Sequence, residues 1–259
     1  MREFTGKVGV VTGAGRGIGL AVVGEMARRG MRVVLSDVEA ARPEQVAQGL
    51  REGGAEVVGM VCDVSDPAQV DRLATRTMEH FGRVDLVCNN AGVVAGGRAW
   101  KIGLKDWHRV LGVNLWGAIH AVRSFVPLLL ENLDGGHVVN VASLAAVVPW
   151  PAIAPYNVSK HGLLALSETL LGDLRAEGST VGVSVVMPGR VATGIGLPSG
   201  APVPDFDDDE PGVLSAEAVA AEIMAAVEED RLYVFTHPDR LEQIEARFDA
   251  ILGRSGDSR

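Results

Sequence analysis

Short runs of consecutive apolar residues alternate along this chain with longer stretches in which apolar residues recur every three or four positions. Because the short runs are apolar on successive residues, they predict strands buried on both faces, and the longer stretches predict helices that cover them. The expected strands are 8–12, 31–36, 56–62, 84–88, 138–142, 181–187 and 232–235. The expected helices are 18–29, 43–52, 66–81, 104–131, 156–177, 215–229 and 239–252. This alternation predicts an α/β fold of the doubly wound, Rossmann type, in which helices cover both faces of a parallel sheet.

We expect a single domain over residues 1–252, because no linker or repeat interrupts the alternation. Residues 253–259 are small and polar, and we expect them to form a disordered tail. Residues 194–212 are rich in Gly, Pro and Asp, a composition that predicts a flexible flap over a substrate site.

The composition excludes several classes of protein. Of the 259 residues, 47% are hydrophobic and 22% are charged, which is typical of a globular protein. The formal net charge of −9 argues against nucleic acid and against an anionic membrane surface as partners. The N-terminal residues contain no signal segment and no apolar run is long enough to span a bilayer, so we expect no membrane association.

Cysteine and histidine usage bears on compartment and on metal binding. Cys62 and Cys88 fall in separate expected strands, and we expect buried thiols there, not a disulfide. We therefore expect a cytoplasmic protein. The six histidines are scattered with no pair at ligand spacing, so no metal site is expected.

A glycine-rich loop, Thr12-Gly13-Ala14-Gly15-Arg16-Gly17-Ile18-Gly19, joins the first expected strand to the first expected helix. This strand–loop–helix context is required of a loop that holds the pyrophosphate of a dinucleotide. Gly13 permits the tight turn, and Gly19 lets the helix pack closely on the sheet. The backbone amides near Arg16, Gly17 and Ile18 begin a helix, so they present unpaired donors to an anion.

The second expected strand is followed by Asp37, at the separation from Gly13 expected of an acid that binds ribose. A carboxylate there would accept hydrogen bonds from the ribose hydroxyls of NAD and repel the 2′-phosphate of NADP. The next residue, Val38, offers no cation to offset that repulsion. Arg16 could reach a 2′-phosphate, so NADP remains the alternative to the favoured NAD.

Tyr156 and Lys160 lie four residues apart and share one face of an expected helix. A nearby ammonium is predicted to lower the pKa of the phenol, which could then exchange a proton with a substrate oxygen near neutral pH. Ser143 follows an apolar strand, so its hydroxyl should lie at the edge of the sheet where ligands bind. There it could hydrogen-bond the same substrate oxygen.

Further motifs extend this pattern. The set is Thr12-Gly13-x-x-x-Gly17-Ile18-Gly19, Asp63-Val64, Asn89-Asn90-Ala91-Gly92, Asn114, Ser143, Tyr156-x-x-x-Lys160 and Pro188-Gly189-x-Val191-x-Thr193. In these motifs the chain resembles the short-chain dehydrogenase/reductase family. The resemblance implies a sheet of seven parallel strands and a homotetramer or homodimer, with helices 104–131 and 156–177 between subunits. An acid at Asp37 without a following base matches the family's NAD-preferring pattern.

The resemblance also implies the contacts of the cofactor. Asp63 and Val64 would contact the adenine, and Asn90 would lie beside the cofactor in a turn with Ala91 and Gly92. At the nicotinamide end, the implied cofactor-binding residues are Tyr156, Lys160, Pro188, Gly189, Val191 and Thr193. Of these, Lys160 would bind the nicotinamide ribose, while Val191 and Thr193 would hold the carboxamide.

The implied catalytic set is Asn114, Ser143, Tyr156 and Lys160. In this set Tyr156 is the acid/base, and Asn114 would kink the long helix and hold a water that relays protons to Lys160.

The apolar segment 144–155 bridges Ser143 and Tyr156 and is predicted to form one wall of a substrate pocket. Leu144 and Trp150 in this wall favour a hydrophobic alcohol or ketone, although Trp150 could equally pack on neighbouring helices. Arg190 could meet an anionic group of the substrate or form a surface salt bridge.

The favoured interpretation is an NAD-dependent oxidoreductase that interconverts a secondary alcohol and a ketone or aldehyde. One alternative is an NADP-dependent carbonyl reductase that uses Arg16. Another is a dinucleotide-binding sensor or scaffold without catalysis, against which the complete Ser, Tyr, Lys and Asn set argues.

Overall fold

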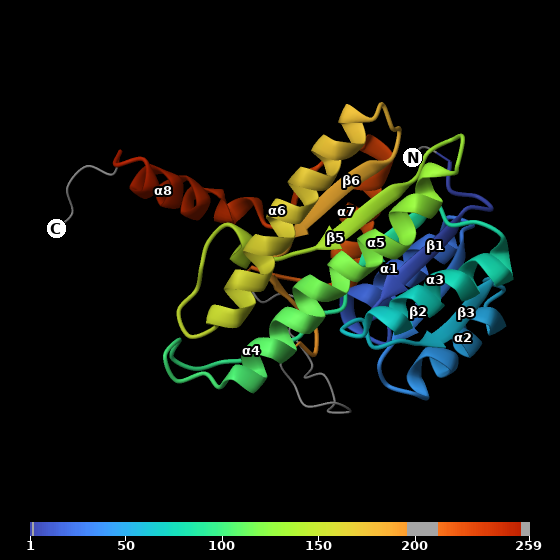
Figure 1. Ribbon diagram of the computed structural model, residues 1–259, viewed down its shortest axis with the longest axis horizontal. Helices are drawn as coiled ribbons and strands as arrows, with labels where there is room; N and C mark the ends of the chain where they lie inside the picture. The colour runs from blue at the N-terminus through green and yellow to red at the C-terminus, as the bar shows by residue number, and fades with distance from the viewer. Residues whose placement is uncertain (2, 196–211, 255–259) are drawn as a thin grey trace.

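The computed structural model describes residues 1, 3–195 and 212–254 of the chain (Figure 1). Most of the predicted flap, and residues 255–259 of the predicted tail, lie outside the described residues. The main sheet has the strand order β3-β2-β1-β4-β5-β6-β9. Its strands are β1 (Val8–Thr12), β2 (Arg32–Asp37), β3 (Val57–Val61), β4 (Leu86–Asn89), β5 (His137–Val141), β6 (Gly182–Met187) and β9 (Tyr233–Phe235). All neighbouring strands pair in parallel, which confirms the predicted fold class.

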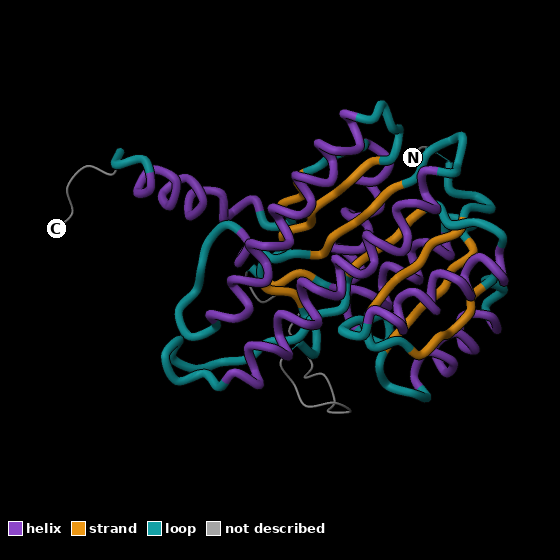
Figure 2. The backbone as a smooth tube through the Cα atoms, viewed as in Figure 1, coloured by secondary structure: helices purple, strands orange, loops and turns teal. Residues whose placement is uncertain are grey.

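Helices cover both faces of this sheet (Figure 2). They are α1 (Gly17–Arg28), α2 (Arg42–Glu52), α3 (Pro67–Phe81), α4 (Leu104–Leu111), η1 (Gly112–Trp116), α5 (Gly117–Leu130), η2 (Leu144–Ala146), α6 (Ala154–Ala176), α7 (Ala216–Glu229), η3 (Pro238–Arg240) and α8 (Leu241–Ile251). One buried cluster packs α1 and α7 on the sheet, and another packs α3, α5 and α6 on the opposite face.

The strands read as continuous apolar runs because both faces of the sheet are covered. In β1, Val8 and Val10 belong to the cluster around α3 and α5, whereas Val11 belongs to the cluster around α1 and α7. Successive side chains of a strand point to opposite faces, so apolar residues are favoured at successive positions when both faces are covered.

The chain reverses its direction of winding between β1 and β4. From β1 it builds outward through β2 to β3, and then returns to place β4 on the other side of β1. A crevice therefore opens between the carboxyl ends of β1 and β4, where open α/β sheets bind ligands.

The long helix expected over 104–131 is interrupted by a single π-helical turn, η1, between α4 and α5. Asn114 lies in this turn and bonds both backbone groups of Val93, through Oδ1 at 2.8 Å and Nδ2 at 2.9 Å. Single π-helical turns in long helices frequently occur at functional sites.

The segment Leu104–Leu130 is long and apolar enough to cross a membrane by length and composition, with a mean hydropathy of 1.3 over its best window. The expectation that no segment reaches this threshold was therefore wrong. Part of the segment serves the core: 44% of that window is buried, and Phe125 and Leu129 are fully buried against the sheet and α3.

Three further features differ from the expectation. A second, two-stranded sheet joins β7 (Arg190–Val191) to β8 (Val213–Leu214), and the pattern predicted neither strand. The last helix begins with the 3₁₀ turn η3 and continues as α8, which projects away from the body of the molecule (Figure 1). Most other boundaries shift by one or two residues, as expected for helix and strand ends.

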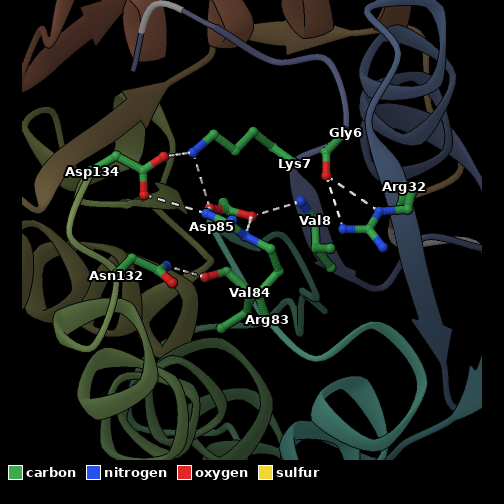
Figure 3. A network of polar contacts seen from close by, with 9 residues as sticks. All are labelled: Gly6, Lys7, Val8, Arg32, Arg83, Val84, Asp85, Asn132 and Asp134. Carbon is green, nitrogen blue, oxygen red and sulfur yellow. Dashed lines mark hydrogen bonds and ion pairs between the residues drawn. The ribbon is translucent and has the colours of Figure 1, made fainter.

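A buried carboxylate ties the amino ends of the strands together (Figure 3). Asp85 is fully buried and accepts hydrogen bonds from the Val8 amide at 2.8 Å and from Arg83 Nε at 2.9 Å. Lys7 Nζ lies 3.5 Å from Asp85 and also pairs with Asp134, in the loop before β5. This network holds together the amino ends of the strands, at the end of the sheet opposite to the crevice.

Candidate cofactor and active site

A cavity of about 1160 Å³ opens at the carboxyl ends of the strands. Most of the residues singled out from the sequence line it. They are Gly13, Arg16, Gly17, Ile18, Asp37, Asp63, Val64, Asn90, Ala91, Gly92, Ser143, Tyr156, Lys160, Pro188, Gly189, Arg190, Val191 and Thr193. The fold therefore brings residues from distant parts of the chain to one space large enough for a dinucleotide and a small substrate.

The glycine loop is shaped by two residues in the left-handed region, Gly13 at φ 60° and Gly17 at φ 56°. A Cβ atom on Gly13 would stand 2.6 Å from Ala91 Cα, so a side chain has no room there. Among the described residues no side chain caps α1, whose first turn faces the cavity. The first amides of α1 therefore donate to no capping side chain, which is the arrangement that a helix N-terminus offers to an anion.

Asn90 fastens the end of β4 to the glycine loop. Its Nδ2 donates to Thr12 O at 3.0 Å and to Gly13 O at 2.9 Å. The Thr12 hydroxyl accepts in return from the amides of Asn90 and Ala91. Gly19 lies outside the cavity lining, packed against the Asn90 side chain, so it lets α1 approach the sheet closely.

Asp37 lies at the end of β2 and its carboxylate also supports the loop. Oδ2 accepts from the Gly15 amide at 2.9 Å, and Oδ1 accepts from the Glu39 amide at 3.3 Å. Glu39 lines the same end of the cavity and pairs with Arg42 at 3.2 Å, while Arg42 donates to Gly15 O. Two carboxylates therefore face this end of the cavity.

Glu39 was missed from the sequence, and its position two residues after Asp37 is the signal that could have found it. His108 and Arg109 at the end of α4 also line the cavity and were missed. One observation favours NADP instead of NAD. Arg16 Nη1 is buried without a hydrogen-bond partner among the described residues, so it could bind a 2′-phosphate.

Asn114 lies behind the cavity wall in η1. Besides its bonds to Val93, its Nδ2 donates to Ser159 Oγ at 3.1 Å. A Cβ atom placed on Gly92 would be 3.8 Å from Asn114 Oδ1 and 3.7 Å from Lys160 Nζ, so both groups converge on this glycine. A small cavity of about 10 Å³ beside Asn114 has room for about one water.

Tyr156 and Lys160 project from α6 toward the cavity, with Lys160 Nζ 5.5 Å from the centre of the Tyr156 ring. Lys160 is buried and donates to Val141 O at 2.8 Å. Burial lowers the pKa of Lys160 to about 8.

The predicted lowering of the Tyr156 pKa is wrong for this structure. Burial raises the pKa of Tyr156, and a hydrogen bond with Ser143 opposes that rise. Removal of the phenol from water disfavours its charged form more than Ser143 favours it. The phenol is therefore protonated at neutral pH and ready to donate a proton.

Ser143 lies two residues after the end of β5, at the carboxyl end of the strand as expected. Its Oγ accepts from the Ala145 amide at 3.1 Å and donates to Pro188 O at 3.4 Å. These contacts hold the hydroxyl beside Tyr156 at the wall of the cavity.

The predicted apolar substrate wall is not found: no residue of segment 144–155 is among the described residues that line the cavity. Leu144 is buried in the core, and Trp150 is 43% exposed. Neither is among the described residues that line the cavity. Leu144 packs in a core cluster with Ala146 and Val147, and Trp150 lies at the surface. Arg190 does line it, from β7.

Cys62 and Cys88 are free and buried. Burial raises the pKa of Cys62 to about 11 and that of Cys88 to about 12, so both are neutral thiols near pH 7. In the described part of the chain, no group of three or more His, Cys, Asp or Glu could hold a metal ion.

Comparison with known proteins shows the family of the chain. Residues 7–201 match the short chain dehydrogenase family. The 1-deoxy-11-beta-hydroxypentalenate dehydrogenase of Streptomyces avermitilis is 37% identical over 244 residues, which cover 93% of this chain and 88% of that protein.

Solved structures with the same fold include cofactor complexes. A short chain dehydrogenase/reductase from Burkholderia phymatum in complex with NAD has a TM-score of 0.90, with 38% identity, and covers 100% of this chain and 99% of that one. An alcohol dehydrogenase from Thermococcus sibiricus complexed with 5-hydroxy-NADP has a TM-score of 0.78, with 28% identity, and covers 88% of this chain and 94% of that one. The chain belongs to the short-chain dehydrogenase/reductase family, whose members are oxidoreductases that bind a nicotinamide dinucleotide.

Proposed function

We propose that this protein is an NAD(H)-dependent dehydrogenase that interconverts a hydrophobic secondary alcohol and its ketone or aldehyde. The observation that carries the proposal is the convergence of Ser143, Tyr156 and Lys160 on the cavity that also contains the glycine loop. The nicotinamide dinucleotide, when bound, supplies the hydride acceptor or donor.

The residues present fit such a cofactor. The glycine loop leaves no room for a side chain at position 13, so its backbone is open to a pyrophosphate. The first turn of α1, whose amides bond no capping side chain, lines the same cavity. Asp37 and Glu39 offer carboxylates to the ribose of the adenosine end.

In this proposal Tyr156 moves the proton. Its phenol, which burial keeps protonated, donates a proton to the carbonyl oxygen during reduction. During oxidation the phenol first loses its proton, and the phenolate then accepts the proton of the substrate hydroxyl. Ser143 holds the same oxygen by a hydrogen bond. The Lys160 ammonium stabilises the phenolate during oxidation, and Asn114 holds a water that returns protons toward Lys160.

NAD is favoured over NADP because the Asp37 carboxylate at the adenosine end would repel a 2′-phosphate, whereas the charge of Glu39 is offset by its pair with Arg42. The relative from Burkholderia phymatum, solved in complex with NAD, supports this choice. The alternative is an NADP-dependent reductase, for which the unpartnered Arg16 Nη1 among the described residues is the specific observation.

The substrate is proposed to carry its hydroxyl group on a hydrophobic skeleton. The Streptomyces relative is a dehydrogenase of a hydroxylated compound by its name, and Val93, Val94 and Ile195 give this cavity apolar walls. The test is a panel of secondary alcohols with NAD⁺, from small and charged to large and apolar. Turnover that increases with apolar size supports the proposal, and a preference for small charged alcohols contradicts it.

We further propose a cytoplasmic homotetramer or homodimer. Exposed apolar side chains on α4, η1 and α6 support subunit packing through these helices: Leu104 is 73%, Trp116 is 53% and Val158 is 49% exposed. Light scattering on the purified protein tests this state, and a monomer at micromolar concentration would contradict it.

A further inference from the structure

His237 lies directly behind the cavity wall, although no motif includes it. It follows β9, is 5% exposed, and faces the segment Pro188–Val191, which lines the cavity. Its Nδ1 accepts a hydrogen bond from the Gly189 amide at 3.0 Å, and its Nε2 lies 3.0 Å from Arg190 O. One imidazole ring therefore bridges two consecutive residues of that wall.

These partners fix the tautomer of the ring. A backbone amide can only donate, so Nδ1 of His237 carries the lone pair and Nε2 carries the hydrogen that it donates to Arg190 O. The Thr236 hydroxyl, 2.8 Å from Nδ1, lies on the same side of the ring. The neutral imidazole thus satisfies one donor and one acceptor of the main chain at once.

The ring also fixes the position of the Gly189 backbone by direct contact. A Cβ atom on Gly189 would stand 2.9 Å from His237 Cγ and 3.0 Å from Cδ2. The backbone of Gly189 therefore rests against the ring, and only glycine permits this approach.

The catalytic serine holds the other end of the same segment. Pro188 O accepts from the Leu144 amide at 2.8 Å and from Ser143 Oγ at 3.4 Å. His237 and Ser143 are thus joined through three residues of backbone. From the same C-terminal part of the chain, Arg247 Nη1 donates to Val147 O at 2.7 Å, in the segment that follows Ser143.

We propose that His237 is a positioning residue for the nicotinamide end of the cofactor site. It holds Gly189 and Arg190 in place and, through Pro188, restrains Ser143. This inference rests on the proposed function, and it assigns to the C-terminal segment a role in catalysis that the sequence motifs do not include.

The test compares His237→Phe, which keeps a ring but loses both bonds, with His237→Asn, whose Oδ1 can replace Nδ1 as acceptor for the Gly189 amide. Exposed His80 on α3 provides the control variant His80→Asn. Binding of NADH is measured beside binding of ADP-ribose, which lacks the nicotinamide. For His237→Phe we expect NADH to bind about fivefold more weakly and kcat/KM to fall about tenfold or more, with ADP-ribose within about twofold of the unsubstituted protein.

His237→Asn is expected to recover most of both losses, which a general loss of stability would not allow. Unchanged NADH affinity and kcat/KM in His237→Phe would overturn the inference. So would equal weakening of NADH and ADP-ribose in both variants, because that result indicates a role in the fold as a whole.

A measurement without cofactor separates this inference from the proposed function. Hydrogen exchange at the Gly189 amide is expected to be about tenfold faster in His237→Phe than in the unsubstituted protein. An unchanged exchange rate overturns the positioning role whatever the protein binds. Failure of the unsubstituted protein to bind NADH would instead overturn the proposed function.

Discussion

The phenol of Tyr156 and the ammonium of Lys160 are both removed from water, and burial pushes their pKa values in opposite directions. It raises the pKa of Tyr156 and lowers that of Lys160 to about 8. Both shifts favour the neutral form of the group. The site therefore holds a protonated phenol beside a lysine that can lose its charge in mildly alkaline solution, which suits proton exchange in both directions.

Replacement of Tyr156 by Phe removes the proton donor and preserves the ring. We expect kcat/KM to fall about 10³-fold, within the range for loss of a general acid, while NADH affinity changes by less than about threefold. Steady-state kinetics and calorimetric titration measure the two quantities. Tyr233→Phe is the matched control, since Tyr233 is half exposed and its hydroxyl donates to Glu168. Equal turnover by the two variants would contradict the assignment.

His137 makes the fold sensitive to acid. It is fully buried, its Nε2 donates to Ser184 Oγ at 2.8 Å, and burial lowers its pKa to about 3. The unfolded chain binds the proton near pH 6.5 and the folded chain does not, so stability is lost as pH falls below 6.5. At pH 5 the loss is about 2 kcal/mol.

Urea unfolding at pH 7.5 and pH 5 checks this prediction. His137→Gln, which cannot take up the proton, should lose about 2 kcal/mol less than the unsubstituted protein between the two conditions. An identical loss in both proteins would show that other groups cause the acid sensitivity.

At the scale of elements, the strands were the most predictable part of the chain. The run 8–12 has the bounds of β1, because burial on both faces demands an unbroken apolar stretch. The family resemblance implied a kink at Asn114, but the hydrophobic pattern did not predict the π-helical turn there, since the turn depends on a contact with Val93, 21 residues away in sequence. The pairing of β7 with β8 was not predicted either, because each strand has only two residues and its partner is distant in sequence.

The candidate site was also predictable where it depends on strand topology, and not where it depends on side-chain packing. Residues at strand ends and in the glycine loop lie where the pattern predicted, because topology brings the carboxyl ends of parallel strands together. Trp150 and Leu144 lie elsewhere, since their positions depend on how η2 and α6 pack and not on any periodicity. His237 was missed because it is close to the site only in space.

The network around Asp85 joins β1, β4 and the loop before β5, so its loss should destabilise the whole sheet. We expect Asp85→Asn to lower the free energy of unfolding by about 3 kcal/mol, because Arg83 and Lys7 lose their buried partner. Asp134→Asn is the matched control: Asp134 is 57% exposed, and its loss should cost less than about 1 kcal/mol. Denaturant titration measures both, and similar losses in the two variants would contradict this view of the network.

At the scale of the whole molecule, the sheet separates two tasks. The amino ends of the strands are held together by the charges around Asp85, while the carboxyl ends open into the cavity. Segments as distant in sequence as the glycine loop and the turn after β6 meet there only because the winding reverses between β1 and β4. The cofactor determines what this cavity can do, so its identity is the central claim.

Paired calorimetric titration with NADH and NADPH tests that claim most directly. We predict that NADH binds at least about tenfold more tightly, a difference of about 1.4 kcal/mol, and that Asp37→Ser reduces this ratio. Equal or tighter binding of NADPH would contradict the account and assign the choice of cofactor to Arg16. Binding of neither dinucleotide would contradict the proposed dehydrogenase itself.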